Sequence, residues 1–149
     1  MNQTQIERLL IEYPELPYRI KELTDKLLLT LALKNNTQDT LRAYKYSHEG
    51  KSKTIVNPVL EAVQKSIDIH EESIKYYQEH IKDYTNRLIA MEKALENLLP
   101  VERRIIDLRY WKRHTWDSVG QKVHFHSDYC KQLRNGILLK IWQHYNYII

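Results

Sequence analysis

A set of polar side chains near the C-terminal end of the sequence has the types and the spacing to contact the edges of DNA bases. The set lies on the outward face of a helix predicted to begin at Ser127, and its members are Ser127, Asp128, Lys131, Gln132 and Asn135. Amide side chains can make two hydrogen bonds to adenine, lysine can reach guanine acceptors or a phosphate, and aspartate can accept from the amino group of cytosine. The inner face carries apolar residues at helical spacing, namely Cys130, Leu133, Ile137 and Ile141. We therefore expect the N-terminal half of this helix to enter the major groove of duplex DNA.

Further residues are predicted to contact the phosphate backbone, which sets register but carries no sequence information. They are Arg104, Arg109, Lys112, Arg113, Thr115 and Arg134. The charge distribution agrees with this prediction, because residues 100–149 contain nine Lys/Arg and four Asp/Glu, whereas residues 1–99 contain fourteen and fifteen. The net charge of +4 therefore comes from the last third of the chain, where a DNA-binding unit is expected.

Short helices must position these side chains. Pro100 suits the first position of one helix, because proline fixes φ and lacks an N–H that would be unpaired there. Thr115 is the predicted N-cap of a second helix, Trp116–Val123, and Ser127 is the predicted N-cap of the third. These three helices would make up the helix-turn-helix that we expect over residues 98–149.

The turn between the second and third helices is predicted at His124-Phe125-His126, with Phe125 as its apolar plug. His124 stands where a glycine is expected, so a positive φ there would be strained. Gly120 is predicted at the closest approach of the two helices, where only a small side chain fits. Gly136 lies inside the third helix, where it either marks a close contact or weakens the helix.

The stretch from Leu98 to Ile141 resembles region four of bacterial sigma factors in its short, extracytoplasmic form. The matching positions are Leu98, Pro100, Glu102, Arg103, Ile105, Ile106, Leu108-Arg109-Tyr110, Thr115, Val119-Gly120, Val123, Phe125 and Gln132. With the leading segment ERLLIEYPELPYRIKEL and a long helix before it, the organisation resembles phage late-operon activators of the RinA, ArpU and LtrC type. The resemblance implies a DNA-binding regulator that acts with host RNA polymerase on phage packaging and structural genes. Two departures, Ser127 and Asp128 in place of basic residues, leave its sequence preference open.

Residues 1–97 are predicted to form an N-terminal helical region. Pro14 and Pro17 should break its first helix, because each removes a backbone donor and restricts the preceding residue. A second helix should run from about Pro17 to Leu33, followed by a polar loop over 35–57 and a long helix over 58–97. Along the long helix, apolar or aromatic residues recur at alternating spacings of three and four, and His70 is the polar exception. This seam comprises Leu60, Val63, Ile67, His70, Ile74, Tyr77, Ile81, Tyr84, Leu88, Met91, Leu95 and Leu98.

Two interpretations of the seam remain open. In the first, the N-terminal helices cover the long helix within one chain. In the second, residues 60–98 pair with a second copy and form a homodimer. Tyr77 and Tyr84 count against a tight parallel dimer because their side chains are bulky. Their hydroxyl groups would also need hydrogen-bond partners when buried.

The composition fits an all-α protein, with a helical hairpin or coiled-coil-like helix before the helix-turn-helix, and the resemblance implies the cytoplasm of the bacterial host cell. The chain is 42% hydrophobic and 28% charged, with three glycines, and its lone cysteine provides no disulfide framework. No apolar run is long enough to span a membrane. No glycine-rich phosphate loop or nucleophile elbow occurs, so no enzyme activity and no cofactor are expected. His124, His126 and Cys130 lack the spacing of zinc motifs, so no metal is expected either.

Two other function classes fit the pattern. A small terminase subunit, which packages phage DNA, also combines a helix-turn-helix with oligomerising helices, although its DNA-binding unit usually comes first. A polymerase or sigma adaptor could use the helix-turn-helix to bind protein alone. Salt-dependent DNA binding separates the adaptor from the other two classes, and a ring-shaped oligomer would indicate packaging.

Overall fold

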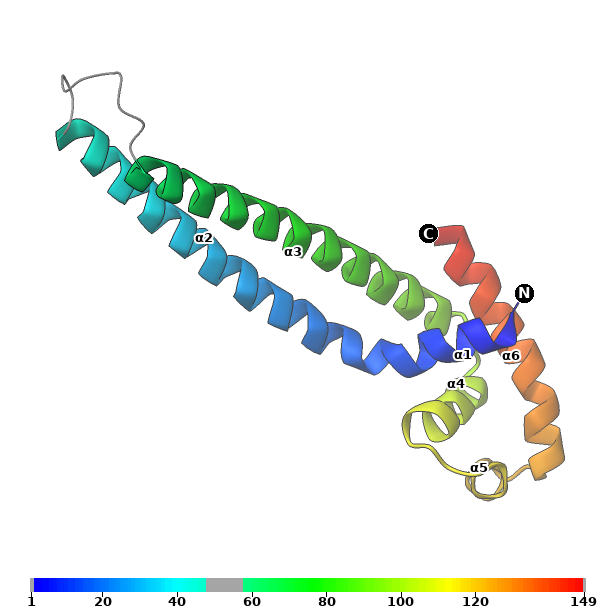
Figure 1. Cartoon of the computed structure of the whole chain (residues 1–149). Coiled ribbons are helices and arrows are strands. Elements are labelled where there is room, and N and C mark those ends of the chain that lie inside the picture. The colour runs from blue at the N-terminus through cyan, green and yellow to red at the C-terminus, as the bar shows by residue number, and fades with distance from the viewer. Residues whose placement is uncertain (1, 48–57, 149) are drawn as a thin grey trace. The chain divides into compact units, whose positions relative to one another are not determined.

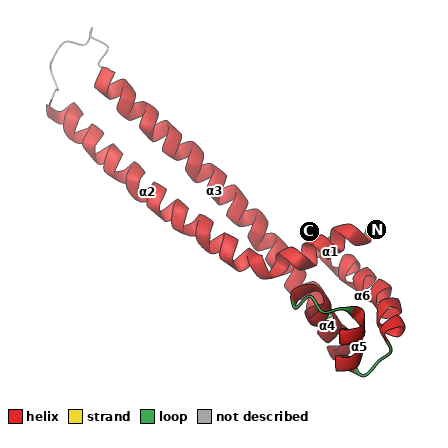
Figure 2. Ribbon diagram, turned by 60° about the horizontal axis from the view of Figure 1, so that its bottom comes forward, coloured by secondary structure: helices red, strands yellow, loops and turns green. Residues whose placement is uncertain are grey.

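The computed structural model of the chain describes residues 2–47 and 58–148, which form helices joined by short connections and contain no strand (Figure 2). The predicted all-α class is confirmed over these residues. In chain order the elements are α1 (Gln3–Glu12), the 3-10 turn η1 (Tyr13–Glu15), α2 (Leu16–Ser47), α3 (Pro58–Glu96), α4 (Pro100–Ile106), the π-helical turn η2 (Asp107–Trp111), α5 (Trp116–Val123) and α6 (Ser127–Ile148). None of the described helices has the length and apolar character needed to cross a bilayer.

The chain divides into two compact units. Unit 1 comprises Met1–Arg19 and Tyr84–Ile149, and unit 2 comprises Ile20–Asp83. Unit 1 thus joins α1 and the end of α3 to all of the helices that follow. The domain boundary predicted at residue 97 would cut through the core of unit 1.

The core of unit 1 is formed by apolar side chains from α1, α3, α4, η2, α5 and α6. Its largest fully buried members are Ile6, Leu10, Met91, Leu95, Ile105, Ile106, Leu108, Val119, Cys130, Ile137, Leu138 and Ile141. Cys130, Ile137 and Ile141 lie on the inner face of α6, as the helical spacing predicts. Leu133, the fourth residue predicted for that face, packs against the core while partly exposed.

Helix α1 is attached to this core by polar contacts as well as by Ile6 and Leu10. The indole Nε1 of Trp111 donates to the backbone oxygen of Leu10 at 2.9 Å, and the Tyr110 hydroxyl donates to Oε1 of Glu7 at 3.2 Å. Burial raises the pKa of Tyr110, and the nearby Glu7 carboxylate raises it further. The first helix of the chain is therefore an integral part of the unit that carries the predicted DNA-binding residues.

The predicted break at Pro14 and Pro17 is present, because α1 ends at Glu12 and α2 begins at Leu16, but only the 3-10 turn η1 separates the two helices. Pro14 lies at the start of η1, and Pro17 lies in the first turn of α2. A proline at the start of a helical segment interrupts few hydrogen bonds, because the first N–H groups of such a segment lack helical partners.

The predicted end of the second helix at Leu33 is wrong, because α2 runs to Ser47. Residues 35–47 of the predicted loop continue α2, and residues 48–57 lie outside the described residues. Polar side chains in this part bond to the helix itself, since the hydroxyl groups of Thr37 and Thr40 donate to the carbonyl oxygens of Leu33 and Asn36 at 2.8 and 3.0 Å. The prediction failed because it took polarity as a stop signal, although polar residues can stay helical in this way.

In unit 2, α2 and α3 lie side by side (Figure 1), and Nζ of Lys34 is 3.4 Å from Oε1 of Glu71. The structure places α3 at Pro58–Glu96, where the sequence predicted a helix over 58–97. The seam residues Ile67 and Ile74 are buried within unit 2, and Met91 and Leu95 are buried in the core of unit 1. Much of the seam is therefore covered within the chain, which favours the intramolecular interpretation.

Gly136 lies in open space on α6, with no atom within 4 Å of the position that a Cβ would occupy. Of the two interpretations of this glycine, the close contact is excluded and the weakening of the helix is retained. We expect Gly136→Ala to raise the free energy of unfolding by about 0.5–1 kcal/mol, because alanine loses less conformational freedom in a helix. Thermal unfolding followed by circular dichroism measures this change, and a lower melting temperature would contradict the prediction.

Candidate nucleic-acid interface

Helices α5 and α6 are joined by a short turn whose backbone is fixed by hydrogen bonds. Thr115 is the N-cap of α5, as predicted, and its hydroxyl oxygen accepts from the N–H of Ser118 at 3.3 Å. Beyond Val123, His124 adopts a left-handed conformation with φ 62° and ψ 35°. The N–H of Phe125 then donates to the carbonyl oxygen of Gly120 at 3.0 Å. The positive φ considered for His124 is therefore present, at a cost of about 1–2 kcal/mol for a residue with a Cβ.

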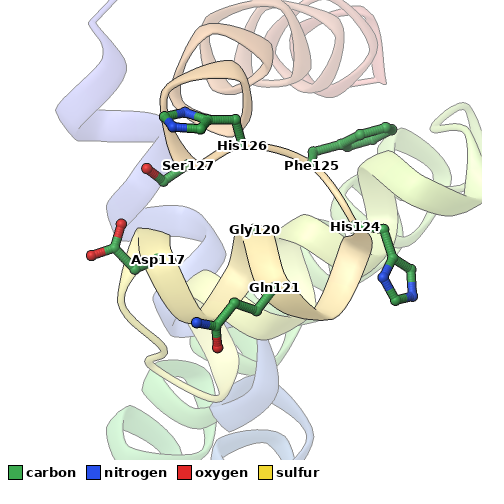
Figure 3. Close-up of a pocket in the computed structure, with 7 residues that line it drawn as sticks. All are labelled: Asp117, Gly120, Gln121, His124, Phe125, His126 and Ser127. Carbon is green, nitrogen blue, oxygen red and sulfur yellow. The ribbon is translucent and has the colours of Figure 1, made fainter.

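Gly120 lies where α5 meets the turn, as the sequence predicted (Figure 3). A Cβ at this position would be 2.6 Å from the carbonyl oxygen of Phe125 and 3.2 Å from the backbone nitrogen of Ser127. Both neighbours are backbone atoms, which cannot move aside as a flexible side chain can. The absence of a side chain at residue 120 thus allows α6 to begin close to α5.

The N-cap of α6 is His126, and the predicted cap at Ser127 is wrong. The carbonyl oxygen of His126 accepts from the N–H of Cys130 at 3.1 Å, and its Nδ1 accepts from the N–H of Asp128 at 3.2 Å. Ser127 is instead the first residue of α6. An imidazole nitrogen can act as a capping acceptor in place of a hydroxyl oxygen, although sequence rules favour serine.

The predicted role of Phe125 as an apolar plug is also wrong. Its side chain is 39% exposed, and its ring packs edge-on against Tyr129 with the centroids 5.2 Å apart. The turn is held by backbone hydrogen bonds and by the contact at Gly120, so no buried side chain is needed beneath it. Phe125 and Tyr129 therefore form an exposed aromatic pair beside the start of α6.

Four of the five predicted base-contacting residues are exposed on one face of α6, and these are Asp128, Lys131, Gln132 and Asn135. Ser127 is half-buried and lines a shallow hollow between α5 and the turn (Figure 3). The hollow is lined by Asp117, Gly120, Gln121, His124, Phe125, His126 and Ser127. The structure therefore brings the predicted set together at the beginning of α6 and leaves most of it accessible.

One contact to this face could not be predicted from local sequence. Nε2 of Gln3, at the start of α1, donates to Oδ1 of Asn135 at 2.9 Å. Contact of Asn135 with adenine would require Oδ1 to accept from the base, so Gln3 competes for that oxygen. Among the described hydrogen bonds and ion pairs, Lys131 and Gln132 have no such competitor, whereas Oδ2 of Asp128 lies 3.7 Å from Nδ1 of His126.

The predicted phosphate contacts fall into two groups. Arg104, Lys112, Arg113 and Thr115 are exposed. Nζ of Lys112 lies 3.1 Å from Oδ2 of Asp107, and Arg113 has a positive φ of 57° in the connection between η2 and α5. These side chains can reach an anion in solution, although Lys112 would exchange its ion pair with Asp107 for a phosphate.

Arg109 and Arg134 are half-buried and contact Trp116. Their guanidinium carbons lie 4.8 and 5.8 Å from the ring centroid, and Nη1 of Arg109 donates to the carbonyl oxygen of His114 at 2.9 Å. Nε of Arg134 is buried without a hydrogen-bond partner in the structure. A cation over an aromatic ring is stabilised by the ring quadrupole. Both arginines thus help to hold α5 in place, a role that the sequence analysis missed.

Metal ligation receives no support from the described part of the chain. Residues 2–47 and 58–148 contain no group of three or more His, Cys, Asp or Glu side chains that could hold a metal ion. Cys130 is buried in the core of unit 1, where desolvation raises the pKa of its thiol. Its side chain therefore serves packing within this core.

Comparison with known proteins gives one match. A family with the description "Protein of unknown function (DUF722)" matches residues 3–143, which include unit 2 and most of unit 1. No curated protein and no solved structure matches the chain. The match extends from α1 into α6, so the relation covers the first helix of unit 1 as well as the helices that follow.

Proposed function

The chain belongs to the DUF722 family, a family of unknown function, and from the geometry of α6 we propose that it binds duplex DNA as a sequence-specific transcriptional regulator. In this proposal α5, the turn and α6 act as a helix-turn-helix of the sigma region-four type. The N-terminal half of α6 enters the major groove, where Lys131, Gln132 and Asp128 contact base edges. Ser127 and Asn135 lie at the margins of that contact.

The observation that carries the proposal is the exposure of Asp128, Lys131 and Gln132 on one face of a helix whose opposite face is buried. A helix that reads DNA needs this division, because its inner face must fix it to the protein while its outer face stays free. Exposed cations at Arg104, Lys112 and Arg113 support the proposal, since phosphate contacts supply much of the affinity for DNA.

The resemblance to phage late-operon activators supports a more specific role. We propose that the protein activates phage packaging and structural genes together with the RNA polymerase of the bacterial host. Residues 98–141 carry the sigma-like pattern. A footprint upstream of a late promoter, with transcription that depends on the protein, would support this role.

The test of DNA binding uses Lys131→Ala combined with Gln132→Ala in the full chain. We expect the double variant to lose at least about 30-fold in affinity for the selected site, because two good base contacts together contribute about 2–6 kcal/mol. Sites are first selected from random duplexes, and fluorescence anisotropy then measures the affinity at two salt concentrations. Binding of the unchanged protein should weaken steeply with salt, since phosphate contacts release counterions.

A matched control removes the same two side-chain types from α3. Lys75 and Gln78 are both exposed there, and the control combines Lys75→Ala with Gln78→Ala. The control should bind like the unchanged protein, and both variants should keep its circular dichroism spectrum. The proposal is overturned if the selected site is bound equally well by both variants, or if no duplex is bound with a salt-dependent affinity.

A further inference from the structure

One face of α3 in unit 2 lacks charge, although three of its five residues, Ala62, Ile69 and Tyr76, are exposed and the other two are half-buried. We call this face the side stripe, and it comprises Ala62, Ser66, Ile69, Ser73 and Tyr76. Ile69 is 61% exposed and Tyr76 is 56% exposed. The Tyr76 ring contacts only its helix neighbours Tyr77 and His80 among the described ring contacts.

Other exposed positions of α3 are charged, in contrast to the side stripe. Two rows at heptad spacing carry a charge at every position from 61 to 82, and these residues are Glu61, Lys65, Asp68, Glu72, Lys75, Glu79 and Lys82. The side stripe has the same alternating spacings of three and four as the inner seam, and each of its residues directly precedes a seam residue. A helix with two such seams is typical of a bundle with more helices than the hairpin contains.

Helix α2 adds two large apolar residues to the same side of unit 2. Leu29 is 62% exposed and Leu33 is 46% exposed. Each directly precedes an inward residue of α2, and Lys34, which follows Leu33, pairs with Glu71 of α3. In two antiparallel helices, the positions that precede the seam lie on the same side of the pair. One side of unit 2 therefore carries four exposed large apolar side chains, those of Leu29, Leu33, Ile69 and Tyr76. Contact of such a group with water is unfavourable, so it is typical of an interaction surface.

We propose that this side of unit 2 is a homodimer interface, in which α3 packs antiparallel against α3 of a second copy. The side stripe is complementary to itself in more than one antiparallel register, and we consider the register centred between Ser66 and Ile69. In that register Ser66 of one copy faces Ile69 of the other, and Ala62 faces Ser73, so the one bulky residue in these layers meets a small one. A two-fold axis repeats each contact, as an isologous interface requires.

The charged residues beside the side stripe also favour this antiparallel register. Lys65 and Glu72 flank the side stripe, and in this register Lys65 of each copy faces Glu72 of the other. A shift of one heptad in one direction would place Lys65 against Lys65, and a shift in the other would place Glu72 against Glu72. In a parallel dimer the flanking residue opposite Lys65 would be His70, so no such charge pair would form. Both the charges and the layers therefore indicate a second copy of this chain as the occupant.

Sedimentation equilibrium of the full chain without DNA tests the interface. We expect a dimer for the unchanged protein and a monomer for Ile69→Glu, because a carboxylate would be buried at the centre of the stripe. The control Gln78→Glu adds the same charge at an exposed position outside the stripe and should remain dimeric. Circular dichroism verifies that each variant stays folded. A monomer or an oligomer larger than a dimer for the unchanged protein, or a dimer for Ile69→Glu, overturns the proposal.

Charge exchange tests the register. Lys65→Glu and Glu72→Lys should each raise the dimer dissociation constant by about tenfold, since each places two like-charged pairs across the two-fold axis. The double variant Lys65→Glu with Glu72→Lys should restore the dissociation constant to within about twofold. Failure of this restoration overturns the antiparallel register. Because no DNA is present, a monomer that still binds its DNA site would overturn the dimer and leave the proposed function intact.

Discussion

Replacement of Gly120 by alanine is expected to lower the free energy of unfolding by about 2–4 kcal/mol. The new Cβ would lie 2.6 Å from the carbonyl oxygen of Phe125, a distance that real structures avoid. Relief requires movement of the turn backbone, and the same turn carries the hydrogen bond from Phe125 to Gly120 at 3.0 Å. The start of α6 would move with it, so we also expect weaker binding to a DNA site.

Gly136→Ala is the matched control, because it makes the same chemical change in α6, at a position with open space. Relative to the unchanged protein, the melting temperature should fall for Gly120→Ala and rise for Gly136→Ala. Equal shifts in the same direction would show that the response comes from glycine in general. In that case the contact at residue 120 would not control the packing of α5 on α6.

Gly120 also illustrates what could be predicted from the sequence. The prediction came from a local pattern, in which two short helices and a turn leave little room at one residue. Thr115 as a cap and Pro100 as a first helical residue are local in the same sense, and the structure bears out both. The alternating seam of α3 likewise follows from one helix and its period. Such features depend on neighbours within a few residues, so a single sequence specifies them.

Features that depend on distant partners were missed. Nothing near Gln3 indicates that it lies beside Asn135, since the two residues are 132 positions apart. The same holds for Trp111, whose indole bonds to the backbone of Leu10. The sequence therefore placed α1 in a separate N-terminal region, although its apolar face belongs to the core of unit 1. For the candidate site, helical period predicted which residues of α6 are exposed, but it could not reveal the competition for Asn135.

The errors at Ser127 and at residues 35–47 have another physical origin. In both places the prediction used a residue preference, serine for a cap and polar residues for a loop. The structure uses His126 as the cap, and it continues α2 with threonine hydroxyl groups bonded to the preceding turn. Preferences of this kind amount to about 1 kcal/mol or less per residue, so tertiary packing can override them.

The buried carboxylate of Glu102 leads to the second large expected effect. Glu102 is 6% exposed, and its oxygens lie 2.7 and 3.0 Å from Nζ of Lys140 on α6. Oε1 also accepts from the N–H of Leu99 at 3.1 Å, which caps the start of α4. Glu102 therefore joins α4 to α6 through its ion pair with Lys140, and it also caps the N-terminus of α4. Its charge is compensated by one lysine, whose own side chain is 45% exposed.

We expect Lys140→Met to lower the free energy of unfolding at neutral pH by about 3 kcal/mol, because it leaves a buried carboxylate without its cation. Lys131→Met is the control, since it removes an exposed lysine from the same helix and should change stability by less than about 0.5 kcal/mol. Denaturant unfolding followed by circular dichroism measures both changes.

The cause of the loss can be tested by removing the charge of Glu102 as well. Glu102→Gln combined with Lys140→Met leaves no buried charge at this site. The amide oxygen of the new glutamine side chain can still accept from the N–H of Leu99. We therefore expect this double variant to be more stable than Lys140→Met alone, although one substitution has been added. If the double variant is instead the least stable, lysine packing, and not charge compensation, joins α4 to α6.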